Sequence, residues 1–253
     1  MSSSLRRLLA VSVAAVAMAA VSSAHAQEVK LGFLGGFTGP IETLVPPIHE
    51  GAKLAVAQVN EQGGILDGRT LTLLQADSTC IDTTAASAAA DRLVNSENVT
   101  ALVGPLCSGE TIAAANTAAI PGGVVLISPA ATSPALSALD DNDLVFRTTP
   151  SDAYSGQVLA KLLQDRNYGS IAITYVNNDY GKGFADATAA AFEALGGTVA
   201  ANEAHEDGKA DYRAELGSLS SSGAEILVVL AYVDGSGQTI VRQALEGGDF
   251  DKF

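Results

Sequence analysis

Small polar residues follow two strand-like segments near the middle of the chain, and these residues could bind a charged small molecule. One apolar run at residues 99–103 leads into the small-residue stretch 104–111, and a second run at 124–127 leads into 128–134. In an open α/β sheet, ligands bind outside the carboxyl ends of the strands. The order of these segments therefore predicts two ligand loops at one edge of a sheet.

The residue types in these loops suit both charges of a zwitterion. The hydroxyls of Ser108 and Thr132 can donate hydrogen bonds, whereas the carbonyl of Ala130 can accept one from an ammonium group. Free amides where a helix begins after such a loop also favour an anion. Each residue taken alone is an ordinary turn or cap residue, so the prediction rests on the pair of loops.

Strand and helix patterns alternate from residue 27 onward, which predicts parallel sheets with helices on both faces. We expect strands at residues 29–34, 71–74, 99–103, 124–127, 144–147, 171–176, 198–200 and 226–230. We expect helices from Pro46 up to Gly63 and at residues 83–94, 112–119, 154–166, 182–195, 211–220 and 236–245.

Two series of strand–helix units predict two lobes, and the chain crosses between them near residue 148. The expected N-terminal lobe covers residues 27–148 and the expected C-terminal lobe covers 149–253. Glycines at 247 and 248 end the helix at 236–245, with no further strand pattern before Phe253. Because a parallel sheet returns each helix to a strand, we expect the second lobe to be incomplete.

Residues 1–26 have the layout of a secretory signal peptide. Arg6 and Arg7 precede an uncharged apolar run at residues 8–21, and Ala24-His25-Ala26 supplies a cleavage site before Gln27. The run is shorter than the roughly 20 residues that a transmembrane helix needs. We expect export through the general pathway to the periplasm, with the twin-arginine route as the alternative.

The charge of the chain argues against nucleic acid or an anionic membrane surface as a partner. The sequence contains 28 acidic and 14 basic residues; loss of Arg6 and Arg7 with the leader leaves 12 basic residues and a formal charge of −16. Such a field repels polyanions. It does not restrict a small ligand bound inside a cleft.

Cys80 and Cys107 are the two cysteines of the chain, and each follows a strand-like run. An exported protein meets an environment that permits a disulfide. The alternative is a pair of buried free thiols.

The chain resembles the Leu/Ile/Val-binding protein family, the periplasmic substrate-binding proteins of branched-chain amino-acid ABC importers with a type I periplasmic binding fold. The matching motifs cover nearly everything after the leader and occur at residues 59–65, 106–108, 127–134, 146–149 and 178–183. The resemblance implies ligand contacts by Leu106, Ser108, Ala130, Ala131 and Thr132 in the first lobe. It also implies that Tyr180 and Tyr232 cover the ligand from the second lobe, although ordinary half-buried packing explains such tyrosines equally well.

The same resemblance implies a Cys80–Cys107 disulfide, no cofactor, and a monomer that passes an amino acid to a membrane permease. It further implies that the chain continues beyond Phe253 and that the missing part carries an acidic partner for the ligand ammonium. One departure concerns specificity. Leu44 stands in the first loop where the family can carry an aromatic residue, so aromatic acids, amides, urea or another small carboxylate remain alternative ligands.

Two other functional classes compete with a solute-binding protein. A nucleotide-dependent enzyme is disfavoured because the glycines after the first strand do not have the G-x-G-x-x-G spacing, and Asp77 lies beyond the expected offset. His49 and His205 are scattered singles without metal-ligand spacing. A periplasmic ligand sensor on the same fold remains open.

Overall fold

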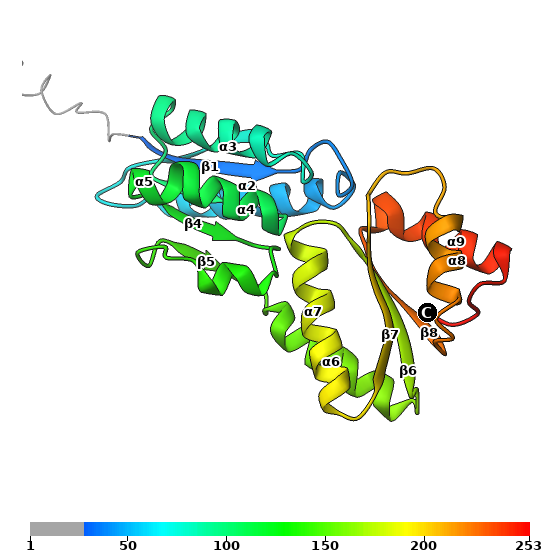
Figure 1. The fold of residues 1–253 in the computed structure, drawn as a ribbon. Helices are drawn as coiled ribbons and strands as arrows, with labels where there is room; N and C mark the ends of the chain where they lie inside the picture. The colour runs from blue at the N-terminus through cyan, green and yellow to red at the C-terminus, as the bar shows by residue number, and fades with distance from the viewer. Residues whose placement is uncertain (1–27) are drawn as a thin grey trace, which may run out of the picture.

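The structure is a computed structural model that describes residues 28–253, and the signal peptide predicted at residues 1–26 lies outside the described residues. The chain forms two lobes, each a parallel sheet between two layers of helices (Figure 1). The predicted fold class is therefore confirmed. Within residues 28–253, none of the helices combines the length and the apolar character that a membrane crossing requires.

The first lobe contains a five-stranded parallel sheet with the order β2-β1-β3-β4-β5. Its strands are β1 (Val29–Gly35), β2 (Leu71–Asp77), β3 (Ala101–Val103), β4 (Val125–Ser128) and β5 (Val145–Arg147). The carboxyl ends of β1, β3 and β4 point to one edge of this sheet. At Gly104, just past β3, φ is +93° and a Cβ atom would lie 2.0 Å from the carbonyl oxygen of Leu34. Only glycine allows the chain to turn out of the sheet there.

Helices cover both faces of the first sheet because successive side chains of β1 point to opposite faces. Phe33 packs with Val45 at the start of α2 (Val45–Glu61), and Leu34 packs with Leu93 and Ala114 on the other face. That second layer consists of α3 (Thr83–Asp91), a π-helical turn at Arg92–Ser96, α4 (Ser108–Ala114), a further π-helical turn at Ala115–Ala119, and α5 (Ile120–Gly122). A 3₁₀ turn at Pro134–Ala138 follows β4.

The second lobe contains a three-stranded parallel sheet with the order β7-β6-β8. Its strands are β6 (Ser170–Val176), β7 (Thr198–His205) and β8 (Ile226–Leu230). Ile171 and Ile173 face α6 (Asp152–Asp165) and α7 (Asp179–Ala194), whereas Ala172 and Leu227 face α8 (Arg213–Ser220) and α9 (Gln238–Gly247). Figure 1 shows the two helix pairs on opposite sides of the strands. A kinked turn at Val233–Gly237 precedes α9.

Side-chain caps determine where several helices begin. Asp82 accepts hydrogen bonds from the amides of Thr84 and Ala85 at the start of α3, at 2.9 and 3.0 Å. Ser151 caps α6 and Asn178 caps α7 in the same way. The last cap starts α7 at Asp179, three residues earlier than the apolar pattern predicts.

Two further differences from the sequence prediction affect the site. The helix expected at 112–119 begins at Ser108, because Cys107 is extended and its carbonyl accepts from the amide of Thr111 at 2.9 Å. The residues after α9 return to the second sheet, where the amide of Leu227 donates to the carbonyl of Lys252 at 3.1 Å. Phe250 is buried in the same cluster as Leu227.

Candidate ligand site between the lobes

A cavity of about 310 Å³ lies between the lobes, beside the carboxyl ends of the first sheet. Both lobes line it, and its lining residues are Ile41, Leu44, Ile48, Leu106, Cys107, Ser108, Ala130, Thr132, Tyr180, Ala231, Tyr232 and Val233. Six of the seven residues predicted to contact a ligand are in this set. The seventh, Ala131, is buried behind the loop, where its carbonyl accepts from the Thr149 hydroxyl at 3.0 Å.

Ser108 joins the two loops that the sequence places at the site. Its side-chain oxygen accepts hydrogen bonds from the backbone amides of Thr132 at 3.3 Å and Ser133 at 3.1 Å. A serine oxygen has two acceptor positions and one donor, so these bonds use its acceptors and leave its O–H to donate. The buried Ser108 therefore fixes the loop after β4 and presents one donor.

Arg147 at the end of β5 holds the same loop from the other side. Its Nη1 atom donates to the carbonyls of Thr132 at 3.0 Å and Ser133 at 2.7 Å. The amide of Asp152 also donates to the carbonyl of Thr132 at 2.9 Å. Three backbone contacts of Thr132 are thus defined by neighbouring groups, which orients its side chain.

Asp152 is a buried acidic residue behind Thr132 that the sequence did not point to, and it is not among the residues that line the cavity. It lies in the first turn of α6 and is only 3% exposed. Among the described residues, its Oδ2 atom is buried without a hydrogen-bond partner. Burial raises the pKa of this carboxyl, while the neighbouring Thr132 and Ser155 side chains and the nearby Arg147 charge oppose that rise. An orphaned carboxylate oxygen beside Thr132 suits a cationic group.

Apolar side chains form the other end of the cavity. Ile41 and Leu106 are buried with the disulfide in one cluster, and Ile48 packs against that cluster from α2. Leu44 is 54% exposed and lines the cavity from the loop before α2. This part of the cavity offers aliphatic contacts, whereas Ser108 and Thr132 offer hydroxyls.

Two tyrosines of the second lobe face the first. Their rings stack with centroids 5.3 Å apart, and Tyr232 Oη accepts from Asn178 Nδ2 at 3.1 Å. Burial raises the pKa of Tyr180 to about 12, and burial also raises that of Tyr232. Both phenols are therefore neutral donors at physiological pH.

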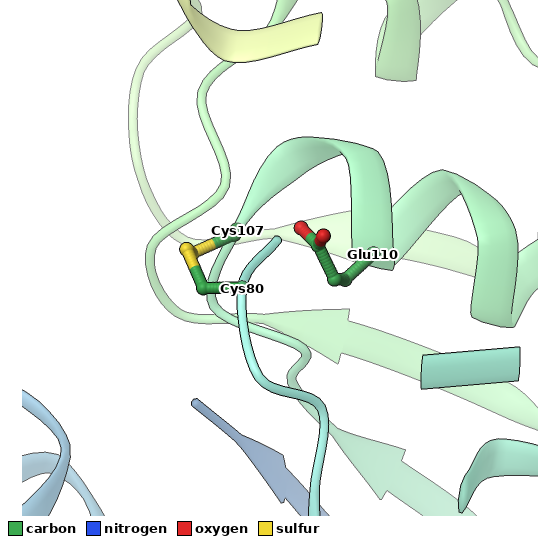
Figure 2. Close-up of side chains that lie close together, drawn as sticks. All are labelled: Cys80, Cys107 and Glu110. Atoms are coloured by element: carbon green, nitrogen blue, oxygen red, sulfur yellow. A yellow bond between two sulfur atoms is a disulfide. The ribbon is translucent and has the colours of Figure 1, made fainter. Parts of the chain in front are cut away.

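Cys80 and Cys107 form the disulfide, with their Cα atoms 5.3 Å apart. It ties the loop after β2 to the start of α4, and Cys107 lines the cavity. Figure 2 shows Glu110 next to this bond, and its carboxylate oxygen lies within 4.8 Å of both sulfur atoms. Because the sulfurs are bonded to each other, this group offers a metal ion no thiolate.

The two-lobed fold and a polar–apolar cavity between the lobes define a class of proteins that bind small solutes. The chain belongs to the periplasmic binding protein family, whose sequence profile matches residues 28–253.

Individual relatives are more specific. The Leu/Ile/Val-binding protein of Escherichia coli K12 is 30% identical over 234 residues, which are 92% of this chain and 62% of that protein. The leucine-, isoleucine-, valine-, threonine- and alanine-binding protein of Pseudomonas aeruginosa is 31% identical over 235 residues, covering 92% of this chain and 61% of that protein. The chain thus spans less than two thirds of the length of these curated relatives.

Solved structures agree with this relationship. The branched-chain amino acid transporter substrate-binding protein of Streptococcus pneumoniae, in complex with isoleucine, matches with a TM-score of 0.77 and 30% identity, over 89% of this chain and 63% of that one. A solute-binding protein of Rhodopseudomonas palustris in complex with 3,4-dihydroxybenzoic acid matches with a TM-score of 0.72 and 18% identity, over 87% of this chain and 59% of that one. The second match shows the fold alone.

Proposed function

We propose that this protein is the extracytoplasmic solute-binding component of an ABC importer and binds an aliphatic amino acid between its lobes. The observation that carries the proposal is the cavity with two kinds of lining: the hydroxyls of Ser108 and Thr132 in one part and aliphatic side chains in the other. Such a site suits reversible binding of a ligand without any chemical reaction, followed by closure of the two lobes around it. The names of the relatives support a branched-chain ligand.

Each polar group has a role in this proposal. The Ser108 hydroxyl and the amides at the start of α4 meet the ligand carboxylate, and the Ala130 carbonyl and the Thr132 hydroxyl meet the ammonium. Leu106 and Leu44 contact the side chain of the ligand. Tyr180 and Tyr232 cover the ligand from the second lobe.

Asp152 lies behind Thr132, whose carbonyl accepts from the Asp152 amide at 2.9 Å, and its negative charge favours an amino acid over the alternative carboxylate, amide or urea ligands. A nearby negative charge attracts an ammonium group and repels a carboxylate. Thermal-shift and calorimetric titrations with L-leucine, 4-methylpentanoate and 3-methylbutylamine test this, because the last two each lack one charged group. We expect L-leucine to raise the melting temperature most. No shift with any aliphatic amino acid would refute the proposal.

Location and transport need separate tests. If residues 1–26 are cleaved, protein from the periplasmic fraction begins at Gln27 by N-terminal sequencing. Uptake of labelled ligand by cells with and without this protein separates an importer component from a sensor on the same fold. Loss of uptake on deletion supports the importer, and unchanged uptake supports the sensor.

A further inference from the structure

A second cavity between the lobes, of about 480 Å³, carries charged groups of one sign only. Its charged lining residues are Glu110 from the first lobe and Asp179, Glu206 and Asp207 from the second. The residues that line it include no lysine or arginine. The cavity lies past the disulfide from the proposed ligand site, because Cys80 and Cys107 line one cavity each.

Glu110 is the buried member of this group. Its residue is 4% exposed, and Figure 2 shows its side chain leaving the first turn of α4 beside the disulfide. Among residues 28–253, no other side chain donates a hydrogen bond to its carboxylate, and the one group that stabilises its charge is the amide of its own residue. The site thus stabilises a negative charge poorly.

The second lobe approaches Glu110 with a like charge. Asp179 starts α7, which contacts α4 across the gap between the lobes. Its Oδ2 atom lies 3.1 Å from the point that a Cβ atom on Gly109 would occupy, next to Glu110 in the chain. Closing the lobes therefore brings a carboxylate to the backbone beside Glu110 and removes water from it.

Within residues 28–253, the titratable groups that act on Glu110 all disfavour its ionisation. Asp179 faces it from α7, Asp82 from the loop before α3, and the Tyr232 hydroxyl from the loop after β8. Glu206 and Asp207 lie across the cavity after β7. Burial, followed by the charges of Asp179 and Asp82, raises the pKa of Glu110 to about 7 against the opposing effect of its own amide.

We propose that Glu110 takes up a proton when the lobes close, so that acidic pH favours the closed form. The part of this inference that concerns ligand affinity rests on the proposed function. The sign follows from linkage: the closed form binds more protons, so closure is favoured below the raised pKa and lost as pH rises through it. If Glu110 has an ordinary carboxyl pKa in the open form, the equilibrium constant for closure rises by up to about 30-fold from pH 8.5 to pH 5.5.

The test that needs no ligand measures the distance between dyes on exposed positions of α2 and α6 by energy transfer. Wild type should shorten this distance from pH 8.5 to 5.5, with a midpoint near neutrality. Glu110→Gln should keep the short distance at both pH values, and Asp179→Asn should move the midpoint to lower pH. Glu193→Gln, at an exposed position of α7, is the matched control and should behave as wild type. A wild-type distance independent of pH, or a Glu110→Gln response equal to wild type, would overturn the proposal.

Calorimetry separates this proposal from the proposed function. Titration of the best ligand in two buffers with different ionisation enthalpies gives the number of protons taken up at pH 7. We expect net uptake in wild type and in Glu193→Gln, and none in Glu110→Gln. Binding without proton uptake would refute the Glu110 proposal and leave the binding function intact. A distance that shortens at acid pH in a protein that binds no aliphatic amino acid would support the Glu110 proposal and refute the binding function.

Discussion

Thr43 in the first lobe donates a hydrogen bond from its hydroxyl to the carboxylate of Asp234 in the second. The partners are 191 positions apart in the chain. Thr43 precedes Leu44 and Asp234 follows Val233, and both of these neighbours line the proposed ligand cavity. The contact therefore joins the lobes directly beside the site. A bond formed only when the lobes meet stabilises the closed form.

Replacing Thr43 by valine should speed release of the ligand, because the closed form loses this bond while the cavity keeps its shape. A hydrogen bond to a charged group at an exposed position contributes about 0.5–1.5 kcal/mol, or roughly 2–10-fold in the dissociation rate. Stopped-flow measurement of ligand release checks this. Thr198→Val, at an exposed position of β7, should leave the rate unchanged, and equal rates in both variants would contradict the prediction.

Ser108→Ala and Thr132→Ala should each weaken ligand binding by roughly five-fold or more, the effect of leaving a charged ligand group without a donor. Sequence alone suggests that neither change affects folding. The structure changes that expectation for Ser108, which is buried and accepts two amide hydrogen bonds. Ser108→Ala should also lower the free energy of unfolding by about 1–3 kcal/mol. Calorimetry and urea denaturation check the two effects, and Thr132→Ser should restore binding relative to Thr132→Ala.

Much of the fold was predictable because periodicity and turn residues report local structure. The strand at 226–230 has the predicted bounds, and the glycines at 63 and 64 follow the end of α2. The predicted start of the helix at 112–119 was wrong, because backbone hydrogen bonding begins the helix before its apolar residues do. Small polar residues at 107–111 resemble a loop, yet Cys107 and Thr111 close the first turn of α4 there.

Long-range relationships in the site were less predictable. Asp152 is an ordinary acidic residue for the first turn of a helix, and only the tertiary structure shows its buried, unpartnered oxygen. The Thr43–Asp234 contact has no sequence signal, because it depends on how the lobes are placed. The loop residues Ser108 and Thr132 were predictable because the topology of a parallel sheet brings neighbouring strand ends together.

Asp152→Asn should weaken binding of an amino acid several-fold, since the negative charge behind Thr132 no longer attracts the ligand ammonium. Binding of an analogue without the ammonium group should be unchanged or stronger. Calorimetry with L-leucine and 4-methylpentanoate measures both. The exposed Asp165 of α6, changed to asparagine, is the control. Parallel losses for the two ligands would show that Asp152 acts on structure and not on the ammonium.

Changing both cysteines to serine should destabilise the first lobe. The disulfide spans 27 residues, and a loop of this length corresponds to about 3–4 kcal/mol in the chain-entropy account. Urea denaturation of wild type with and without a reductant measures this, and the double variant should not respond to the reductant. Intact oxidised protein should be two hydrogens lighter than the reduced form. Alkylation of two free thiols in native protein would contradict the prediction.

His205 should make the second lobe less stable in mild acid. Its ring is 2% exposed and lies 2.8 Å from the Thr174 hydroxyl through Nδ1 and 2.9 Å from the Ser236 hydroxyl through Nε2. Burial lowers its pKa to about 4, although Asp207, Glu215 and Glu206 oppose this shift. The unfolded chain therefore binds more protons, so the free energy of unfolding falls as pH drops from about 6.5 towards 4.

The variant His205→Asn isolates this contribution. It should be less stable than wild type at pH 8, because the side chain is smaller and its hydrogen bonds are weaker. It should also lose less stability between pH 6.5 and 4, by up to about 3 kcal/mol relative to wild type. Urea denaturation at a series of pH values gives both curves. Curves that stay parallel across this window would show that His205 does not control the acid sensitivity of the lobe.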